Sequence, residues 1–139
     1  MKIFIIILST FFWAKSCSQH KNLVEAEIQY VAETRGYYYS VNIENEKFYV
    51  INTRNGEPNE VSLKKSEWKL LLDLYSDIDL TTFEQLVGAT NERRYDKRPF
   101  GNLFITNSGK KIETKGFDHK IPPKEIKLFV DLILQYSKK

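Results

Sequence analysis

Residues 26–53 read AEIQYVAETRGYYYSVNIENEKFYVINT, and this stretch decides the fold class of the chain. Apolar and polar side chains alternate over residues 26–32, which is the pattern of a strand with one buried face. Arg35-Gly36 interrupts the alternation, a second alternating run covers residues 37–43, and residues 48–53 form a third run rich in β-branched and aromatic residues. Three consecutive strands joined by short turns predict a hairpin-rich, antiparallel sheet.

Two amphipathic helices and a further hairpin follow. The first helix is predicted by apolar residues spaced i, i+3, i+4 and i+7, namely Trp68, Leu71, Leu72 and Tyr75. Residues 103–106 and 111–115 predict a hairpin across a Gly-containing turn. Pro122-Pro123 opens the second helix, whose apolar face holds Ile126, Phe129, Val130 and Ile133. The order of strands, helix, strands and helix predicts an α+β fold, an antiparallel sheet with two main helices packed on one face.

Two weaker local patterns complete the fold prediction. Residues 61–63 predict a short fourth strand after the polar loop of residues 54–59. Thr81 and Glu84 have the spacing of a capping box, which predicts a short helical turn over residues 82–87.

The composition is that of one globular domain without a nucleic-acid partner. The chain has 139 residues, 42% hydrophobic and 28% charged, which accommodates a single domain. Its formal net charge is +3, but Lys2 and Lys15 precede Cys17, so the chain from Cys17 onward carries 19 basic and 18 acidic residues. Nucleic-acid-binding domains usually have a much stronger basic bias. With one cysteine, no intramolecular disulfide can form.

The N-terminus has the pattern of an export signal. Met1-Lys2 is followed by an almost wholly apolar segment, residues 3–14, and Cys17 lies three residues beyond its end. An apolar run of about a dozen residues matches the core of a signal peptide. A membrane-spanning helix needs roughly 20 residues, so we expect export rather than a permanent span.

Ala14-Lys15-Ser16-Cys17 resembles the processing site of bacterial lipoprotein precursors, in which a small residue precedes the cysteine that becomes the first mature residue. Lys15 departs from the family pattern, which prefers a small uncharged residue there. The resemblance implies that a diacylglycerol is joined to the Cys17 sulfur and that cleavage follows Ser16. Two or three acyl chains, at about 0.8 kcal/mol per buried CH₂, would hold the protein firmly on a membrane. The alternatives are a soluble secreted protein or an uncleaved short anchor in which Cys17 is incidental.

The predicted organisation therefore has three parts. Residues 1–16 are a lipoprotein signal peptide, residues 17–24 are the lipidated cysteine and a polar tether, and residues 25–139 are a single α+β domain. The resemblance implies a location in the bacterial cell envelope, facing the periplasm or the cell exterior. Ser18 favours the outer membrane, because an aspartate at that position favours inner-membrane retention in enteric lipoproteins.

Within the domain, three segments resemble small, functionally uncharacterised envelope lipoproteins. They are Ser66-Glu67-Trp68, Arg93-Arg94-Tyr95-Asp96, and Phe117-Asp118-His119 before Pro122-Pro123. This resemblance implies a hairpin-rich sheet with two helices and implies no activity.

Familiar catalytic and cofactor motifs do not occur in the sequence. It has no Gly-rich phosphate loop, no paired cysteines for zinc and no Gly-x-Ser-x-Gly segment. The thiol of Cys17 is assigned to lipid, and His119 is the sole histidine after the tether. We therefore expect no catalytic residue, no bound metal and no cofactor.

One constellation of polar residues remains, in the two segments that flank the 103–115 hairpin. Residues 91–98 precede the hairpin and residues 116–119 follow it, so antiparallel pairing brings both segments to the same end of the sheet. The candidate binding residues are Arg93, Arg94, Asp96, Asp118 and His119. Arginines beside aromatic side chains can clamp a carboxylate, a phosphate or a sulfated sugar.

Other interpretations of these residues stay open. In the first, they form a structural network in which Asp118 pairs with an arginine and His119 holds a loop carbonyl. In the second, Asp96, Asp118 and His119 serve a small hydrolase or hold a metal ion. Trp68 is expected in the core, and Tyr38 is expected to point away from it.

These observations favour a non-enzymatic binding or interaction module, anchored to the envelope through Cys17. Its partner is expected to be an envelope protein or an anionic ligand. The alternatives are the hydrolase or metal-dependent enzyme described above, and an inhibitor of an envelope enzyme.

Overall fold

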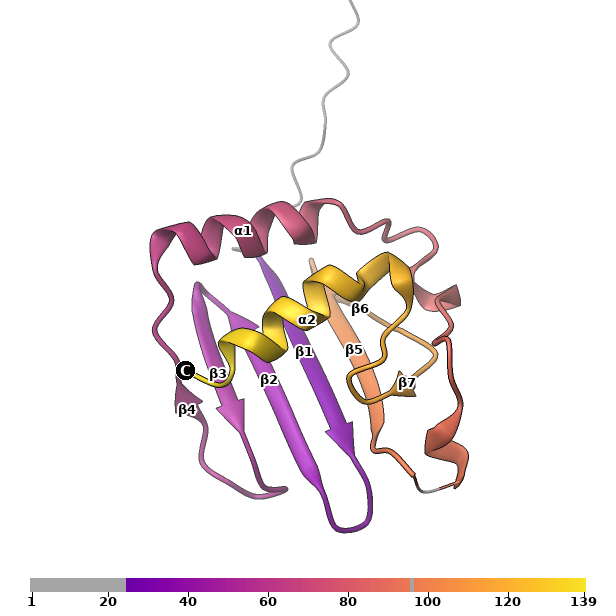
Figure 1. The fold of residues 1–139 in the computed structure, drawn as a ribbon. Coiled ribbons are helices and arrows are strands. Elements are labelled where there is room, and N and C mark those ends of the chain that lie inside the picture. The colour runs from indigo at the N-terminus through magenta and orange to yellow at the C-terminus, as the bar shows by residue number, and fades with distance from the viewer. Residues whose placement is uncertain (1–24, 96) are drawn as a thin grey trace, which may run out of the picture.

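The computed structural model describes residues 25–95 and 97–139, which form a seven-stranded antiparallel sheet with two helices on one face (Figure 1). The strands are β1 (Ala26–Glu33), β2 (Tyr38–Glu44), β3 (Lys47–Ile51), β4 (Asn59–Glu60), β5 (Phe100–Asn107), β6 (Lys110–Glu113) and β7 (Phe117–Asp118). The helices are α1 (Lys65–Ser76) and α2 (Lys127–Tyr136), with 3-10 turns η1 (Phe83–Gln85), η2 (Glu92–Tyr95) and η3 (Lys124–Ile126). The predicted α+β class is confirmed.

The sheet is built around β1, which pairs with β2 on one side and β5 on the other. The strand order is β4-β3-β2-β1-β5-β6, and β7 pairs with the start of β5. Tyr30, in the middle of β1, lies opposite Val41 of β2 and Leu103 of β5. Side chains of one row therefore lie side by side across three strands.

The core lies between the sheet and the two helices. Alternate residues of the central strands point into it, as the period of 2 requires. The buried set includes Ile28, Tyr30, Ala32, Val41, Ile43, Leu103 and Ile105 from the sheet, and Leu71, Tyr75, Phe129, Val130 and Ile133 from the helices. Because each large apolar side chain contributes about 1.5–3 kcal/mol on burial, this layer is the main source of stability.

The predicted hairpin of β5 and β6 is confirmed, and its turn explains its register. Asn107 and Lys110 form the last strand pair, which leaves Ser108 and Gly109 as a two-residue turn. Both have positive φ values, 50° and 77°, as a type I′ turn requires. After β6 the chain continues along β5, because the Thr114 amide donates to the Leu103 carbonyl and β7 then pairs with residues 100–101.

Some predicted details differ from the structure. The fourth strand is Asn59–Glu60 and not residues 61–63, since Val61 turns into the core. The helical turn after α1 is the single turn η1, and it has no capping box at Thr81, whose amide and hydroxyl both donate to the Asp79 carboxylate. Trp68 is half-buried at the margin of the core.

The second face of the sheet carries neither α1 nor α2 (Figure 1). Along β1 this face displays Glu27, Gln29, Val31 and Glu33, which alternate with the core residues. No helix in residues 25–95 or 97–139 has the length and apolar character needed to cross a membrane. Four predicted features lie outside the described residues: the predicted signal peptide, Cys17, the predicted tether and Asp96.

Candidate functional site

The structure brings Arg93 and Asp118 together at the β7 end of the sheet. Asp118 is fully buried, and its carboxylate accepts four hydrogen bonds. The donors are the Thr90 hydroxyl, the backbone amides of Glu92 and Arg93 at 2.8 and 2.9 Å, and the Arg93 guanidinium at 3.2 Å. Asp118 therefore holds the N-terminal end of η2 against the sheet, as a capping carboxylate does.

These contacts keep the Asp118 carboxylate charged. Burial alone raises its pKa, but the hydrogen bonds from Thr90, the two backbone amides and the guanidinium outweigh burial and lower the pKa to about 2. The Arg93 side chain is only 9% exposed, and its guanidinium also donates to the Thr90 carbonyl. Asp118 and Arg93 thus form a buried ion pair that holds η2 against the sheet, and we call this pair the brace.

The other predicted arginine does not join this brace. Arg94 lies on the exposed side of η2, where its backbone amide donates to the Asn91 carbonyl. The geometry favours the structural-network interpretation of Arg93 and Asp118, since both side chains are almost fully buried and bond to each other.

His119 lies next to Asp118 in sequence but packs on the opposite, core-facing side, among tyrosines. It is 7% exposed, and its Nδ1 atom lies 2.7 Å from the Tyr30 hydroxyl. Its Nε2 atom lies 3.5 Å from the Tyr37 hydroxyl, at the limit of a hydrogen bond. The Tyr39 ring packs 6.2 Å away, centroid to centroid. His119 is therefore packed beneath side chains and does not open into a cleft.

The environment of His119 favours its neutral form. Burial, with the nearby charges of Lys120 and Arg98, lowers its pKa to about 4. Burial also raises the pKa of Tyr30, and the Tyr30 hydroxyl forms the 2.7 Å hydrogen bond with Nδ1. Both ring nitrogens thus lie against tyrosine hydroxyls, and the ring does not open toward a substrate. Within the described residues, no group of three histidine, cysteine, aspartate or glutamate side chains is placed to hold a metal ion.

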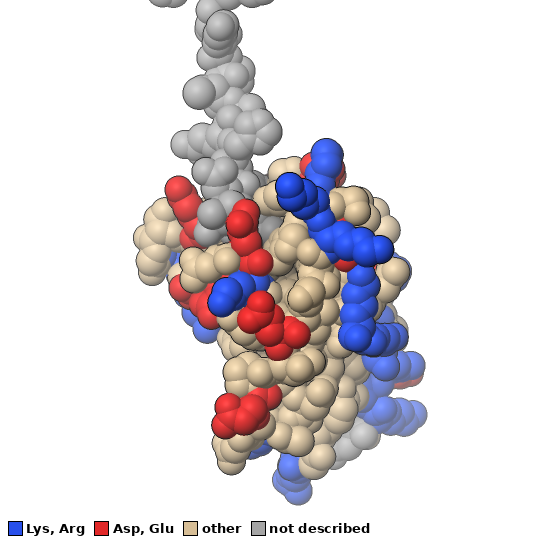
Figure 2. Space-filling model, turned by 90° about the vertical axis from the view of Figure 1, so that its left-hand side faces the viewer, with Lys and Arg blue, Asp and Glu red and all other residues tan. Residues whose placement is uncertain are grey.

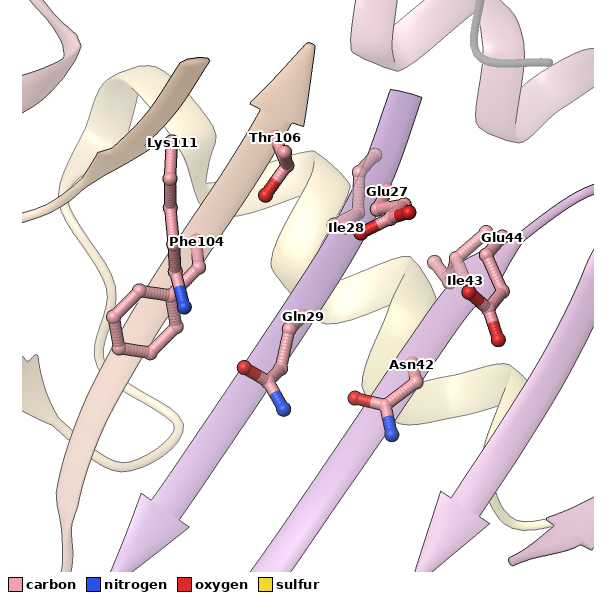
Figure 3. Close-up of a pocket in the computed structure, with 9 residues that line it drawn as sticks. All are labelled: Glu27, Ile28, Gln29, Asn42, Ile43, Glu44, Phe104, Thr106 and Lys111. Atoms are coloured by element: carbon pink, nitrogen blue, oxygen red, sulfur yellow. The ribbon is translucent and has the colours of Figure 1, made fainter. Parts of the chain in front are cut away.

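The feature that sequence reasoning missed lies on the uncovered face of the sheet. Two adjoining hollows of about 210 and 290 Å³ share Gln29 and Phe104, and together they form what we call the β1 trough. The first hollow is lined by Glu27, Ile28, Gln29, Asn42, Ile43, Glu44, Phe104, Thr106 and Lys111 (Figure 3). The second is lined by Gln29, Val31, Glu33, Tyr38, Phe100, Asn102 and Phe104.

Strand pairing explains why these side chains meet. Gln29 lies opposite Asn42 on β2 and opposite Phe104 on β5, so a ring and two amides form one row across the trough. The Oδ1 atom of Asn42 is buried and has no hydrogen-bond partner among the described residues. Lys111 places its ammonium nitrogen 4.3 Å from the centroid of the Phe104 ring.

The charges seen from the β4 side are unevenly distributed. In Figure 2 most lysines and arginines lie on the helix side, and most acidic residues lie on the sheet side with a few lysines or arginines among them. At one end of the trough, Glu27 and Glu44 come from neighbouring strands, and Figure 3 shows both carboxylates at that end. In the described part of the chain, neither has an ion-pair partner.

Sequence reasoning had a signal for this face, since residues such as Glu27 and Gln29 alternate with core residues. What it lacked was the pairing of β1 with β5, which brings Phe104 beside Gln29. Comparisons of the chain with protein-family models, with curated proteins and with solved structures find no match.

Proposed function

We propose that this is a lipid-anchored protein of the bacterial envelope, whose domain is a non-enzymatic binding module that binds through the β1 trough. The observation that carries the binding proposal is the hollowed, uncovered sheet face. The anchor rests on the apolar segment of residues 3–14 followed by Cys17.

The composition of the trough supports binding of an extended partner. Its side chains combine partly exposed aromatic rings, Phe104 and the 44% exposed Phe100, with amide groups that can both donate and accept hydrogen bonds. Aromatic anchors with polar surroundings are typical of protein interfaces. The two hollows lie open along one face of the sheet and do not enclose a compact cavity. A partner that lies across the sheet face fits this shape better.

The hydrolase alternative has less support. Asp118 accepts four hydrogen bonds, and the 7% exposed His119 ring is hydrogen-bonded to Tyr30 through Nδ1. An inhibitor of an envelope enzyme would use the same trough, so it is one form of the binding proposal.

The anchor is tested by metabolic labelling in a lipoprotein-competent bacterium. The wild-type protein should incorporate a labelled fatty acid, and Cys17→Ser should not, because serine lacks the thiol that takes the diacylglycerol. Absence of label from the wild-type protein would refute the anchor and leave the binding proposal unaffected.

The binding surface is tested by photocrosslinking in intact cells. A photoreactive amino acid at Thr106, in the first hollow, should give a covalent adduct. The same amino acid at Leu128, which is 69% exposed on α2, is the matched control and should give none. Adducts from position 128 alone, or none from position 106, would contradict the use of the trough.

A further inference from the structure

A third hollow lies beyond one end of the β1 trough. It has a volume of about 230 Å³ and is lined by residues 35–38, where the chain turns from β1 into β2, and by residues 52–54, which follow β3. Both segments lie at the same end of the sheet, at the bottom of Figure 1. Tyr38 lines this hollow and the second hollow of the trough, so the two adjoin. We call it the arginine hollow, after Arg35 and Arg54 in its lining.

The lining of the arginine hollow favours a negatively charged ligand. Its polar side chains are two guanidinium groups, two tyrosine hydroxyls, one asparagine amide and one threonine hydroxyl, and every one of them can donate hydrogen bonds. None of its lining residues is acidic, whereas the lining of the trough includes Glu27, Glu33 and Glu44. The arginine hollow therefore suits a ligand group that accepts hydrogen bonds and carries negative charge.

The guanidinium of Arg54 is held in place. Its Nη1 atom lies 3.0 Å from the Glu33 carboxylate, and its Nη2 atom donates to the Thr34 carbonyl at 3.2 Å. It also lies over the Tyr38 ring, 5.6 Å from the ring centroid. A guanidinium has five N–H donors, so Arg54 keeps donors for a ligand after these contacts.

The side chain of Arg35 is free by comparison. It is exposed and forms no hydrogen bond or ion pair within the described part of the chain. Arg35 and Arg54 each carry one positive charge, and Glu33 offsets one of the two, so a net charge of about one remains. One carboxylate neutralises that charge and can accept two parallel N–H bonds from a guanidinium.

We propose that the arginine hollow binds a carboxylate of a polypeptide partner whose chain lies along the β1 trough. Arg35 and Arg54 donate to the carboxylate oxygens, and the Tyr38 ring contacts the part of the partner that passes from the trough into the hollow. The six residues from Glu27 to Glu33 span about 20 Å at about 3.3 Å per residue, so a short extended segment reaches from the far end of the trough to the hollow. This inference rests on the proposed function of the trough and names the chemical group that the partner presents at one end.

The test measures binding of N-acetyl-tetraalanine to the full chain by saturation-transfer NMR, which detects weak ligands. Three forms are compared at equal ionic strength: the free acid, the C-terminal amide, and the amide with one alanine replaced by glutamate. The free acid or the glutamate form should bind at least about fivefold more tightly than the uncharged amide, because only a carboxylate pairs with the guanidinium groups. Which of the two binds shows whether the carboxylate comes from a chain end or from a side chain. Equal binding of all three forms would overturn the inference.

Two arginine variants separate this site from general charge attraction. Arg35→Gln should remove most of the preference for the carboxylate, and Arg94→Gln, which removes an exposed arginine elsewhere, should change it by less than about twofold. Arg35→Gln should also melt within about a degree of the wild type, because its side chain makes no contact that the fold uses. Equal losses of binding in the two variants, or a clearly lower melting temperature for Arg35→Gln, would overturn the inference. If no form binds better than the amide while position 106 still gives an adduct, the carboxylate inference fails and the proposed function stands.

Discussion

Acidification between pH 7.5 and pH 5 should destabilise the domain through His119. The imidazole is packed under the tyrosine cluster and forms a hydrogen bond with the Tyr30 hydroxyl through Nδ1. Protonation would create a buried imidazolium at this 7% exposed position, and burial disfavours the charged form. The positive charges of Lys120 and Arg98 oppose the imidazolium further.

The size of the effect follows from the two pKa values. The folded pKa is about 4 and the ordinary value is 6.5, so the unfolded chain binds a proton more readily throughout this interval. Stability therefore falls as the pH drops below 6.5 and stops falling through this group near pH 4. With 1.36 kcal/mol for each pKa unit, the loss at pH 5 is about 2 kcal/mol. Such a loss is a large share of the stability of a small domain.

Urea denaturation at pH 7.5, 6.5, 5.5 and 5.0 measures this loss directly. His119→Gln is the control, because glutamine keeps hydrogen-bonding groups at this site but does not titrate. The variant should be less stable at pH 7.5 and change by less than about 0.5 kcal/mol over the same interval. If the wild-type protein shows as flat a profile as His119→Gln, the buried, neutral state of His119 is refuted.

Five further substitutions test the packing. Asp118→Ala should lower the free energy of unfolding by about 3–5 kcal/mol, because it leaves the buried Arg93 guanidinium without its carboxylate. In a double-mutant cycle measured by urea denaturation, the losses from Asp118→Ala and Arg93→Ala should be strongly non-additive. Additive losses would refute the pairing of Asp118 with Arg93. Trp68→Ala should cost about 1–3 kcal/mol in thermal melts, less than a fully buried tryptophan, since its ring is half-exposed; a loss above about 4 kcal/mol would contradict this placement. Gly88→Ala should lower the free energy of unfolding by about 1–3 kcal/mol, because the new Cβ atom would lie 2.7 Å from the Cβ atom of Phe117 in β7. A Cβ atom added at Gly36 would meet no atom within 4 Å, so Gly36→Ala should leave stability unchanged or raise it slightly. Equal losses of stability at the two glycines would contradict the close packing at Gly88.

The parts of the fold that could be predicted from the sequence are those with a regular buried face. Apolar residues recur at every second position in β1 and β2 because one face of each strand meets the core. In α1 they recur with the helical period for the same reason. β7 escaped prediction because it has two residues, too few for a period, and is held by pairing with β5. η2 escaped because its N-terminal end is held by Asp118, which lies more than 20 residues away along the chain.

Part of the candidate site could be predicted from the sequence. Antiparallel pairing of a hairpin fixes which flanking segments meet, and this rule is enough to place Arg93 near Asp118. The rule does not reveal that Asp118 is saturated by backbone amides, since those bonds depend on the path of η2. Nor does it link His119 with Tyr30, 89 residues apart, because that contact needs the order of β1 and β5 in the sheet.

The placement of the two helices leaves one sheet face open in the described chain. Six strands in a row, at about 4.8 Å each, span about 29 Å. Both helices run across these strands on the same side of the sheet (Figure 1), so the other face carries no helix. A face that only met water would be filled by polar side chains, as Glu27 and Gln29 illustrate. Partly exposed Val31 and Phe104 depart from that expectation at the centre of the same face, and the partner proposed for the β1 trough would cover their apolar surface.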